Sequence, residues 1–300
     1  MTNVTGVNNC SAEQIQYKKP GILKKAGGCA AGILASNLVK ICAPIFISPS
    51  IMFKMAKINT TLTKDQFEQI GKATEEAIKT SGLDKKGVSI LKATSYNAEE
   101  ISGVLKKEVK KGFARFLPES YTKDMVANVQ NQVLDGMNAF YADASKKIVL
   151  PENGMKLVNF HEIGHALNAN CSKFGKILQK SRAASMLVLP ILLISLLKTK
   201  KAEGEQPKNK LDKAGDFIKN NAGKLAFASF LPVIAEESLA TIKGLGLAKK
   251  TLSPDLVKKI AKTNVLGLLT YVSLALFTSI GITLGVKLKD KIAHNEVKKQ

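Results

Sequence analysis

Long apolar runs dominate the pattern of this sequence. The longest one without a charged residue is Asn264–Val286. As an α-helix it would be about 34 Å long, enough to cross the ~30 Å hydrocarbon core of a bilayer. We therefore predict a transmembrane helix at 264–286, followed by a basic tail at 287–300. Lysines flank the run on both sides, so the positive-inside rule does not orient it.

Three other apolar runs precede this one. Residues 26–53 are long enough to cross a bilayer, although a lysine and two prolines interrupt them, and we expect a membrane-associated, spanning segment there. The run 183–197 would reach only about 22 Å as a helix. Together with 225–235, and with a lysine-rich loop at 199–221 between them, it predicts an apolar hairpin that dips into the membrane. The alternative for these runs is buried helix pairs in a soluble core.

The region between the first two runs, 54–135, has the mixed periodicity of a soluble α+β segment. Thr63 and Gln66 have the spacing of a capping box, which predicts a helix that Gly82 ends. The other elements expected there are a strand at 88–91, a helix at 98–111 capped by Asn97 and ended by Gly112, and a helix at 121–134.

A β-hairpin is expected next. Residues 138–142 and 148–150 read as short strands, and Ala144-Ser145 lies between them at turn spacing. With the helices on either side, the chain is predicted to be mainly α with a small β element. Residues 1–25 are mostly polar and predict a disordered, basic N-terminus.

The composition of the chain limits its partners. The formal net charge is +21, with 45 Lys and Arg against 24 Asp and Glu, and only Arg115 and Arg182 are arginines. Readout of nucleic acids favours arginine and aromatic stacking, and aromatic residues make up only 6% of this chain. We therefore expect lysine-rich surfaces that attract anionic lipid headgroups, and no nucleic-acid partner. The four cysteines have no metal-binding spacing, and the polar N-terminus does not resemble a cleavable signal peptide.

The strongest chemical signal is the motif H-E-I-G-H at His161–His165. On a helix, expected here at 155–170 with Asn153 as its cap, the two histidines lie one turn apart on one face, and both can reach one zinc ion. Glu162 would lie beside the metal without binding it, as the general base that takes a proton from a bound water. Two of the three histidines of the chain are in this motif. The alternative is a surface helix with two unrelated histidines.

Three groups of residues together resemble the membrane-embedded gluzincin metallopeptidases, whose best-known types are the type I CAAX prenyl protease and the bacterial heat-shock membrane protease. They are Asn138-Ala139-Phe140, similar to the N-A-F strand of the family; the H-E-I-G-H motif; and Glu237-Ser238-Leu239-Ala240-Thr241, similar to its E-x-x-A-D motif. Apolar segments fall between the second and third motifs, as in the family. The resemblance covers roughly residues 136–250 and implies a zincin-like catalytic region there.

The resemblance also implies the rest of the site. Glu237 would be the third zinc ligand. Asn138, Ala139 and Phe140 would form an edge strand that pairs with an extended polypeptide substrate. Thr241 stands where the family has an aspartate that orients a zinc-binding histidine, and a hydroxyl does this only partly.

Helix geometry separates the two adjacent glutamates of the third motif. Neighbouring helix positions differ by about 100°, so Glu236 and Glu237 cannot both face the metal. Glu237 shares a face with Ala240 and Thr241, whereas Glu236 shares its face with apolar neighbours and has no polar partner there. We therefore expect Glu237→Gln to lose zinc and Glu236→Gln to keep it.

The sequence as a whole predicts an integral-membrane, multi-pass zinc endopeptidase. Two other functions stay open: a non-catalytic membrane protein with a structural zinc site, and a basic peripheral protein whose H-E-I-G-H motif is accidental. Zinc content separates the last from the other two, and dependence of proteolysis on Glu162 separates the first two. The side chain that stabilises the oxyanion is not assigned, because the candidates Tyr271 and His294 are far away in sequence.

Overall fold

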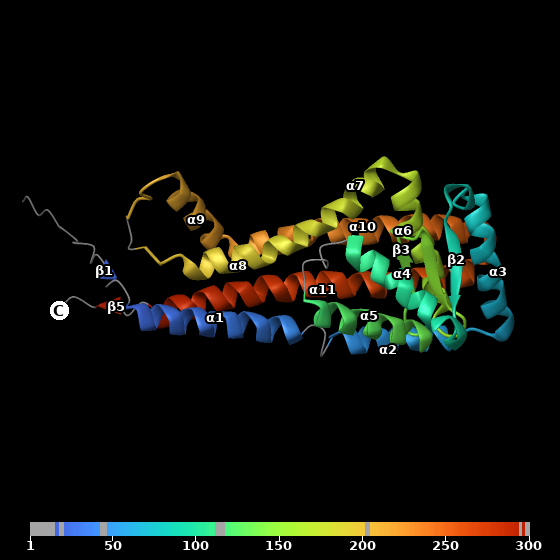
Figure 1. Cartoon of the computed structure of the whole chain (residues 1–300), viewed down its shortest axis with the longest axis horizontal. Helices are drawn as coiled ribbons and strands as arrows, with labels where there is room; N and C mark the ends of the chain where they lie inside the picture. Colours follow the sequence, from blue (N-terminus) through green and yellow to red (C-terminus); the bar gives the residue numbers. More distant parts are fainter. Residues whose placement is uncertain are drawn as a thin grey trace, which may run out of the picture.

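The computed structural model describes residues 16–17, 21–42, 47–111, 118–201, 205–293 and 296–297. The described chain is mostly helical, with long helices side by side at one end and a small sheet with its covering helices at the other (Figure 1). The helices are α1 Ile22–Cys42, α2 Ser48–Asn59, α3 Lys64–Thr80, α4 Ala98–Lys111, α5 Glu119–Leu134, α6 Asn159–Cys171, α7 Lys173–Ser181, α8 Val188–Leu197, α9 Lys210–Asn220, α10 Ala222–Thr251 and α11 Pro254–Ala293. The strands are β1 Gln16–Tyr17, β2 Ser89–Ala93, β3 Phe140–Ala142, β4 Lys147–Pro151 and β5 Glu296–Val297.

A three-stranded sheet lies at the centre of the compact end. Its strand order is β2-β4-β3, with β4 parallel to β2 and antiparallel to β3. The side chains of the middle strand β4 are buried on both faces, because helices cover both: Ile148 and Leu150 pack with α3 and α6, and Val149 packs with α4 and α5. The mostly helical chain with this small three-stranded sheet agrees with the prediction of a mainly α chain with a small β element.

Local signals in the sequence account for both ends of α3. Thr63 and Gln66 form the predicted capping box of α3, each side chain bonding the backbone N–H of the other. Gly82, just beyond the end of α3, has a φ of 69°, a conformation that glycine adopts without strain.

Two predicted boundaries around the sheet are wrong. Asn97 does not cap α4, because its side chain closes a capping box with Thr94 in the 3-10 turn η3 (Ser95–Asn97). The strand predicted at 138–142 is shorter, because the Asn138 side chain accepts the N–H of Ala139 and β3 begins only at Phe140. Gly112, predicted to end α4, lies outside the described residues.

Within the described residues, three helical segments are long and apolar enough to cross a membrane: 173–197, α10 and α11. The predicted run 264–286 is the central part of α11. The run 225–235, predicted as the second arm of a short hairpin, is only the first half of α10, which continues through Pro232 to Thr251. It continues because the second half of α10 buries one face against α6, a tertiary contact that the apolar run does not reveal.

The predicted loop at 199–221 contains a helix. Asn209 caps α9 by accepting the N–H of Asp212. The Lys201 ammonium lies 2.5 Å from Asp212 and 2.6 Å from Asp216, and Lys198 pairs with the same two carboxylates. These lysines hold the pKa of Asp212 well below its usual range. The lysines that favour a solvated loop in the sequence therefore form ion pairs that hold the end of α8 against α9.

α1 packs along the second half of α11 (Figure 1). The two helices meet at glycines, since a Cβ on Gly32 would lie only 2.8 Å from the carbonyl oxygen of Gly285. Small residues that let helix backbones approach closely are common between helices in membranes.

The predicted N-terminal segments fall on two helices and one short strand. The range 26–53 covers most of α1 and the first half of α2, and α1 is not among the three helices that meet the length and hydropathy for a membrane span. Within 1–25, residues 16–17 form β1, which pairs antiparallel with β5. The rest of that range, apart from residues 21–25, lies outside the described residues.

Candidate metal centre

The H-E-I-G-H motif lies in the first turns of α6. A 3-10 turn, η5 (Lys156–Val158), leads into this helix, and Val158 is the N-cap residue, so Asn153 is not the cap that the sequence predicts. Asn153 instead precedes Gly154, whose φ of 116° marks a turn before η5. Phe160 and Ile163 are fully buried in the core that α6 shares with the sheet, which fixes the helix in place.

α6 and α10 cross at very short distance because small residues lie at the crossing. A Cβ on Gly164 would overlap the carbonyl oxygen of Ala240, and a Cβ on Gly244 would overlap the carbonyl oxygen of Phe160. No side chain separates the two backbones at these points. The histidines of α6 are therefore brought directly against the acidic residues of α10.

Gly244→Ala is expected to destabilise the fold by about 1–3 kcal/mol, because the new methyl group has no room beside the backbone of Phe160. The displaced α10 should also bind metal more weakly. Gly246→Ala is the matched control on the same helix, because nothing lies within 4 Å of a Cβ there. It should stabilise the protein by up to about 1 kcal/mol through helix propensity. Thermal unfolding of the purified variants measures both effects, and equal stability would contradict the close crossing.

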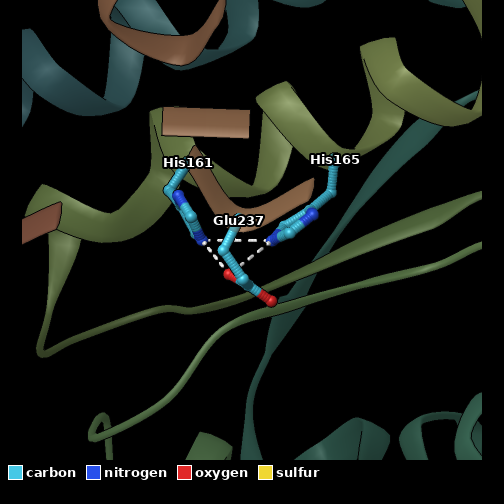
Figure 2. A group of neighbouring side chains, drawn as sticks. All are labelled: His161, His165 and Glu237. Atoms are coloured by element: carbon cyan, nitrogen blue, oxygen red, sulfur yellow. Dashed lines mark hydrogen bonds and ion pairs between the residues drawn. The ribbon is translucent and has the colours of Figure 1, made fainter. Parts of the chain in front are cut away.

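His161, His165 and Glu237 bring three ligand atoms together (Figure 2). His161 Nε2 lies 3.1 Å from His165 Nε2 and 3.1 Å from Glu237 Oε2, and His165 Nε2 lies 3.5 Å from the same oxygen. Atoms that bind one zinc ion tetrahedrally at about 2.0–2.1 Å lie about 3.4 Å from one another. The triangle has the size of one face of such a tetrahedron, so this group could hold a metal ion.

The other nitrogen of each imidazole is engaged by α10. His161 Nδ1 lies 3.1 Å from Thr241 Oγ1, the kind of contact expected for Thr241, and His165 Nδ1 lies 2.9 Å from Glu236 Oε1. With Nδ1 held in this way, the Nε2 atoms are the ones that face Glu237. A hydrogen bond from Nδ1–H to an oxygen orients the ring and makes Nε2 a better metal ligand.

Glu236 has several polar partners, so the expectation that it has none is wrong. Besides His165, it accepts a hydrogen bond from Asn168 Nδ2 at 2.9 Å and one from Arg182 Nη1 at 2.7 Å. The same Arg182 nitrogen lies 3.0 Å from Glu237 Oε1, so one guanidinium forms ion pairs with both glutamates. These partners come from α6 and from the 3-10 turn η6 (Arg182–Leu187), which the neighbours along α10 do not reveal.

Burial and charge act in opposite directions on the titratable groups of α6. Glu162 is buried, and this burial raises its pKa although two histidines lie nearby. Burial lowers the pKa of His165, but hydrogen bonds to Glu236 and Glu237 outweigh it and raise this pKa to about 10. A metal ion bound by His165 must therefore displace a proton, and metal binding should release it.

The metal-binding group faces a cavity of about 1370 Å³. His161, Glu162, His165 and Glu237 belong to its wall, together with the predicted strand residues Asn138, Ala139 and Phe140. β3 is the edge strand on this side, and no further strand of the described chain pairs with it. Tyr271 of α11 also lines the cavity, whereas His294 lies outside the described residues.

Arg182, Asn168 and the role of Glu236 are the parts of the site that the sequence does not identify. One signal for these partners is present in the sequence: two adjacent glutamates follow an apolar run. If the helix continues there, both carboxylates are buried and need partners, because unpaired carboxylates are costly to bury. One of them can bind the metal, and the other then needs a cation. Arg182, one of only two arginines in the chain, meets this need.

Comparison of the chain with protein-family models, with curated proteins and with solved structures gives no match. The assignment of the site therefore rests on its geometry and on the motifs of the sequence.

Proposed function

We propose that this chain is an integral-membrane zinc endopeptidase. The observation that carries the proposal is the triangle formed by His161, His165 and Glu237 in the wall of a large cavity, with Glu162 in the same wall. A structural zinc site is closed by its four protein ligands, whereas a catalytic site has three and keeps one position open. Three ligands beside a large cavity therefore favour a catalytic zinc site over a structural one.

Zinc suits a donor set of two imidazoles and one carboxylate. When bound there, it would lower the pKa of a water molecule and polarise the scissile carbonyl group. Glu162 accepts the proton of that water and passes it to the leaving amine. Its raised pKa suits both steps, because a group that titrates nearer to neutral pH both takes up and gives away a proton readily.

β3 is suited to hold the substrate beside this base. Its outer edge has no partner strand in the described chain, so an extended peptide can add to it through backbone hydrogen bonds. A backbone hydrogen bond from Tyr141 of β3 reaches the Glu162 carboxylate. A peptide that pairs with β3 would therefore lie next to Glu162.

The long apolar helices support a location in a membrane. Large apolar side chains are exposed along their outer surfaces, among them Leu189, Leu193, Leu231, Leu276 and Leu284. Water-soluble proteins rarely expose so continuous an apolar surface, whereas a bilayer covers it. The sheet and α3 to α6 lie at the other end of the molecule (Figure 1). In this proposal the long helices cross the membrane and the site lies near its boundary.

The protein is expected to sediment with membranes and to resist extraction with alkaline carbonate. The physical reason is the apolar surface of 173–197, α10 and α11, which only detergent can replace. Fractionation of expressing cells followed by immunoblotting measures this. Recovery of the full-length chain in the soluble fraction without detergent would contradict the membrane location.

Metal content and proteolysis test the proposed activity together. The detergent-purified protein is expected to bind one zinc ion per chain and to cleave casein or itself. A chelator should abolish cleavage, and added zinc should restore it. Failure to bind zinc would refute the proposal. Stoichiometric zinc without cleavage would instead indicate the alternative, a non-catalytic membrane protein with a structural zinc site.

A further inference from the structure

Methionine is concentrated in the wall of the cavity. Of the six methionines that the structure describes, all but Met125 line it. They come from four separate parts of the chain: Met52 and Met55 from α2, Met137 after α5, Met155 before η5, and Met186 from η6.

Some of these methionines form the base of the wall and others face open space. Met55 and Met155 are buried and pack together with Ile51, beside Leu266 of α11. Met52, Met137 and Met186 are more than one-third exposed. Methionine is unbranched and polarisable, so such a surface accommodates apolar side chains of different shapes. The charged residues of the wall outside the metal centre include both signs, so the cavity does not select one charge.

Two polar side chains of α11 lie in the same wall and have no hydrogen-bond partner among the residues that the structure describes. Asn264 is 3% exposed, and neither its Nδ2 nor its Oδ1 has a hydrogen-bond partner among the described residues. Thr263 is fully buried, and its hydroxyl also lacks a described partner. An unpartnered buried amide is costly, and polar residues within an apolar helix often serve function. A carboxamide offers one acceptor and two donors, which complement the N–H and C=O of a peptide group.

We propose that Asn264 of α11 and the exposed methionines Met52, Met137 and Met186 form the substrate-binding wall of the cavity, and that the site takes an extended, apolar polypeptide segment. This inference rests on the proposed function and names its substrate class. Asn264 binds a backbone amide of the segment, β3 binds the backbone from the edge of the sheet, and the methionines contact its side chains. Recognition is therefore strict for an extended, apolar chain and tolerant of the shape of each side chain.

Peptide binding to a non-cleaving protein tests the role of Asn264. The probe is a fluorescein-labelled peptide rich in Leu and Phe, added to zinc-loaded Glu162→Gln protein in detergent, with affinity read by fluorescence anisotropy. Adding Asn264→Leu should weaken binding about tenfold, the value of one to two hydrogen bonds. The same change should raise the unfolding temperature, because it removes an unpaired buried amide. Unchanged affinity with a raised unfolding temperature would overturn the role of Asn264.

Ser36→Ala is the matched control for this variant. Ser36 on α1 is fully buried, its hydroxyl lacks a described partner, and it is not in the cavity wall. Ser36→Ala, like Asn264→Leu, should be at least as stable as the parent protein. Unlike Asn264→Leu, it should bind the peptide with unchanged affinity. Weaker peptide binding by Ser36→Ala would show that the effect of Asn264→Leu is indirect, and would overturn the assignment.

The methionine wall is tested with the three exposed positions. Replacing Met52, Met137 and Met186 together by Gln should weaken binding of the apolar peptide at least tenfold and leave a Ser- and Asn-rich peptide of equal length unaffected. Met125→Gln is the control outside the cavity and should change neither. Equal binding of both peptides by the parent protein would overturn the substrate class. So would a fluorescent fatty acid that binds in the cavity and is not displaced by the apolar peptide.

The outcomes separate this inference from the proposed function. Zinc-dependent cleavage of casein that is insensitive to Asn264→Leu and to the methionine replacements leaves the peptidase in place and removes the inference. Zinc binding without any cleavage, combined with selective binding of the apolar peptide, removes the peptidase and leaves the binding surface.

Discussion

Glu162→Gln is expected to lower the rate of peptide hydrolysis by at least about 10²–10⁴-fold, the usual contribution of a general base. Glutamine keeps the size of the side chain but cannot accept the proton of the attacking water. Bound zinc should stay at one ion per chain, because Glu162 is not part of the triangle formed by His161, His165 and Glu237. The measurement is cleavage of casein by protein of known zinc content.

The free energy of unfolding of the Glu162→Gln protein shows whether the loss of hydrolysis is a loss of catalysis or a loss of folding. Burial raises the pKa of Glu162, so its charged form is the costly one in the folded protein, and a neutral glutamine should not lower the free energy of unfolding. Glu100→Gln on α4 is the control, since that carboxylate is exposed and far along the chain from the motif. A Glu162→Gln protein that cleaves at the wild-type rate would refute the assignment of the base.

The features that the sequence predicts correctly depend on short spacings along the chain. The capping box of Thr63 and Gln66, and the apolar run inside α11, involve residues close in sequence. The spacing of His161 and His165 is also local, because one helical turn separates them. For such features, helix geometry alone fixes the contact once the helix forms.

The features that the sequence misses depend on contacts between distant segments. The second half of α10 is helical because it packs on α6, and the glycines at that crossing matter only because the two backbones meet. The loop at 199–221 contains α9 because Lys198 and Lys201 find acidic partners on it. Charge on its own predicts a loop at 199–221, and tertiary ion pairs reverse that prediction.

Glu237→Gln is expected to lower zinc affinity the most among variants of α10, because it removes the one carboxylate in the triangle. Its Oε2 lies 3.1 Å from His161 Nε2, within the spacing of two ligands on one zinc ion. A neutral amide oxygen is a much weaker zinc ligand than a carboxylate. Titration of the metal-free protein with zinc, with a chelator of known affinity as competitor, measures the loss.

Glu236→Gln is the matched neighbour, and the structure changes what is expected of it. Glu236 does not face the metal but holds His165 Nδ1 at 2.9 Å and pairs with Arg182. Loss of such an orienting carboxylate typically costs about 10–100-fold in metal affinity. The variant should therefore bind zinc more weakly than the wild type, and not equally well as the apolar neighbours of Glu236 on the helix suggest.

The order of the two affinities decides between the two glutamates. If Glu237 binds the metal, Glu236→Gln keeps one zinc ion per chain at saturation, and Glu237→Gln loses it over the same range. The Arg182 guanidinium contacts both carboxylates, so each variant loses one ion pair with Arg182. A difference in zinc affinity between the two variants therefore does not come from Arg182. A protein that keeps zinc without the Glu237 carboxylate and loses it without that of Glu236 would reverse their roles. The two glutamates differ in one respect that matters for the metal: only Glu237 Oε2 lies within reach of both imidazole Nε2 atoms.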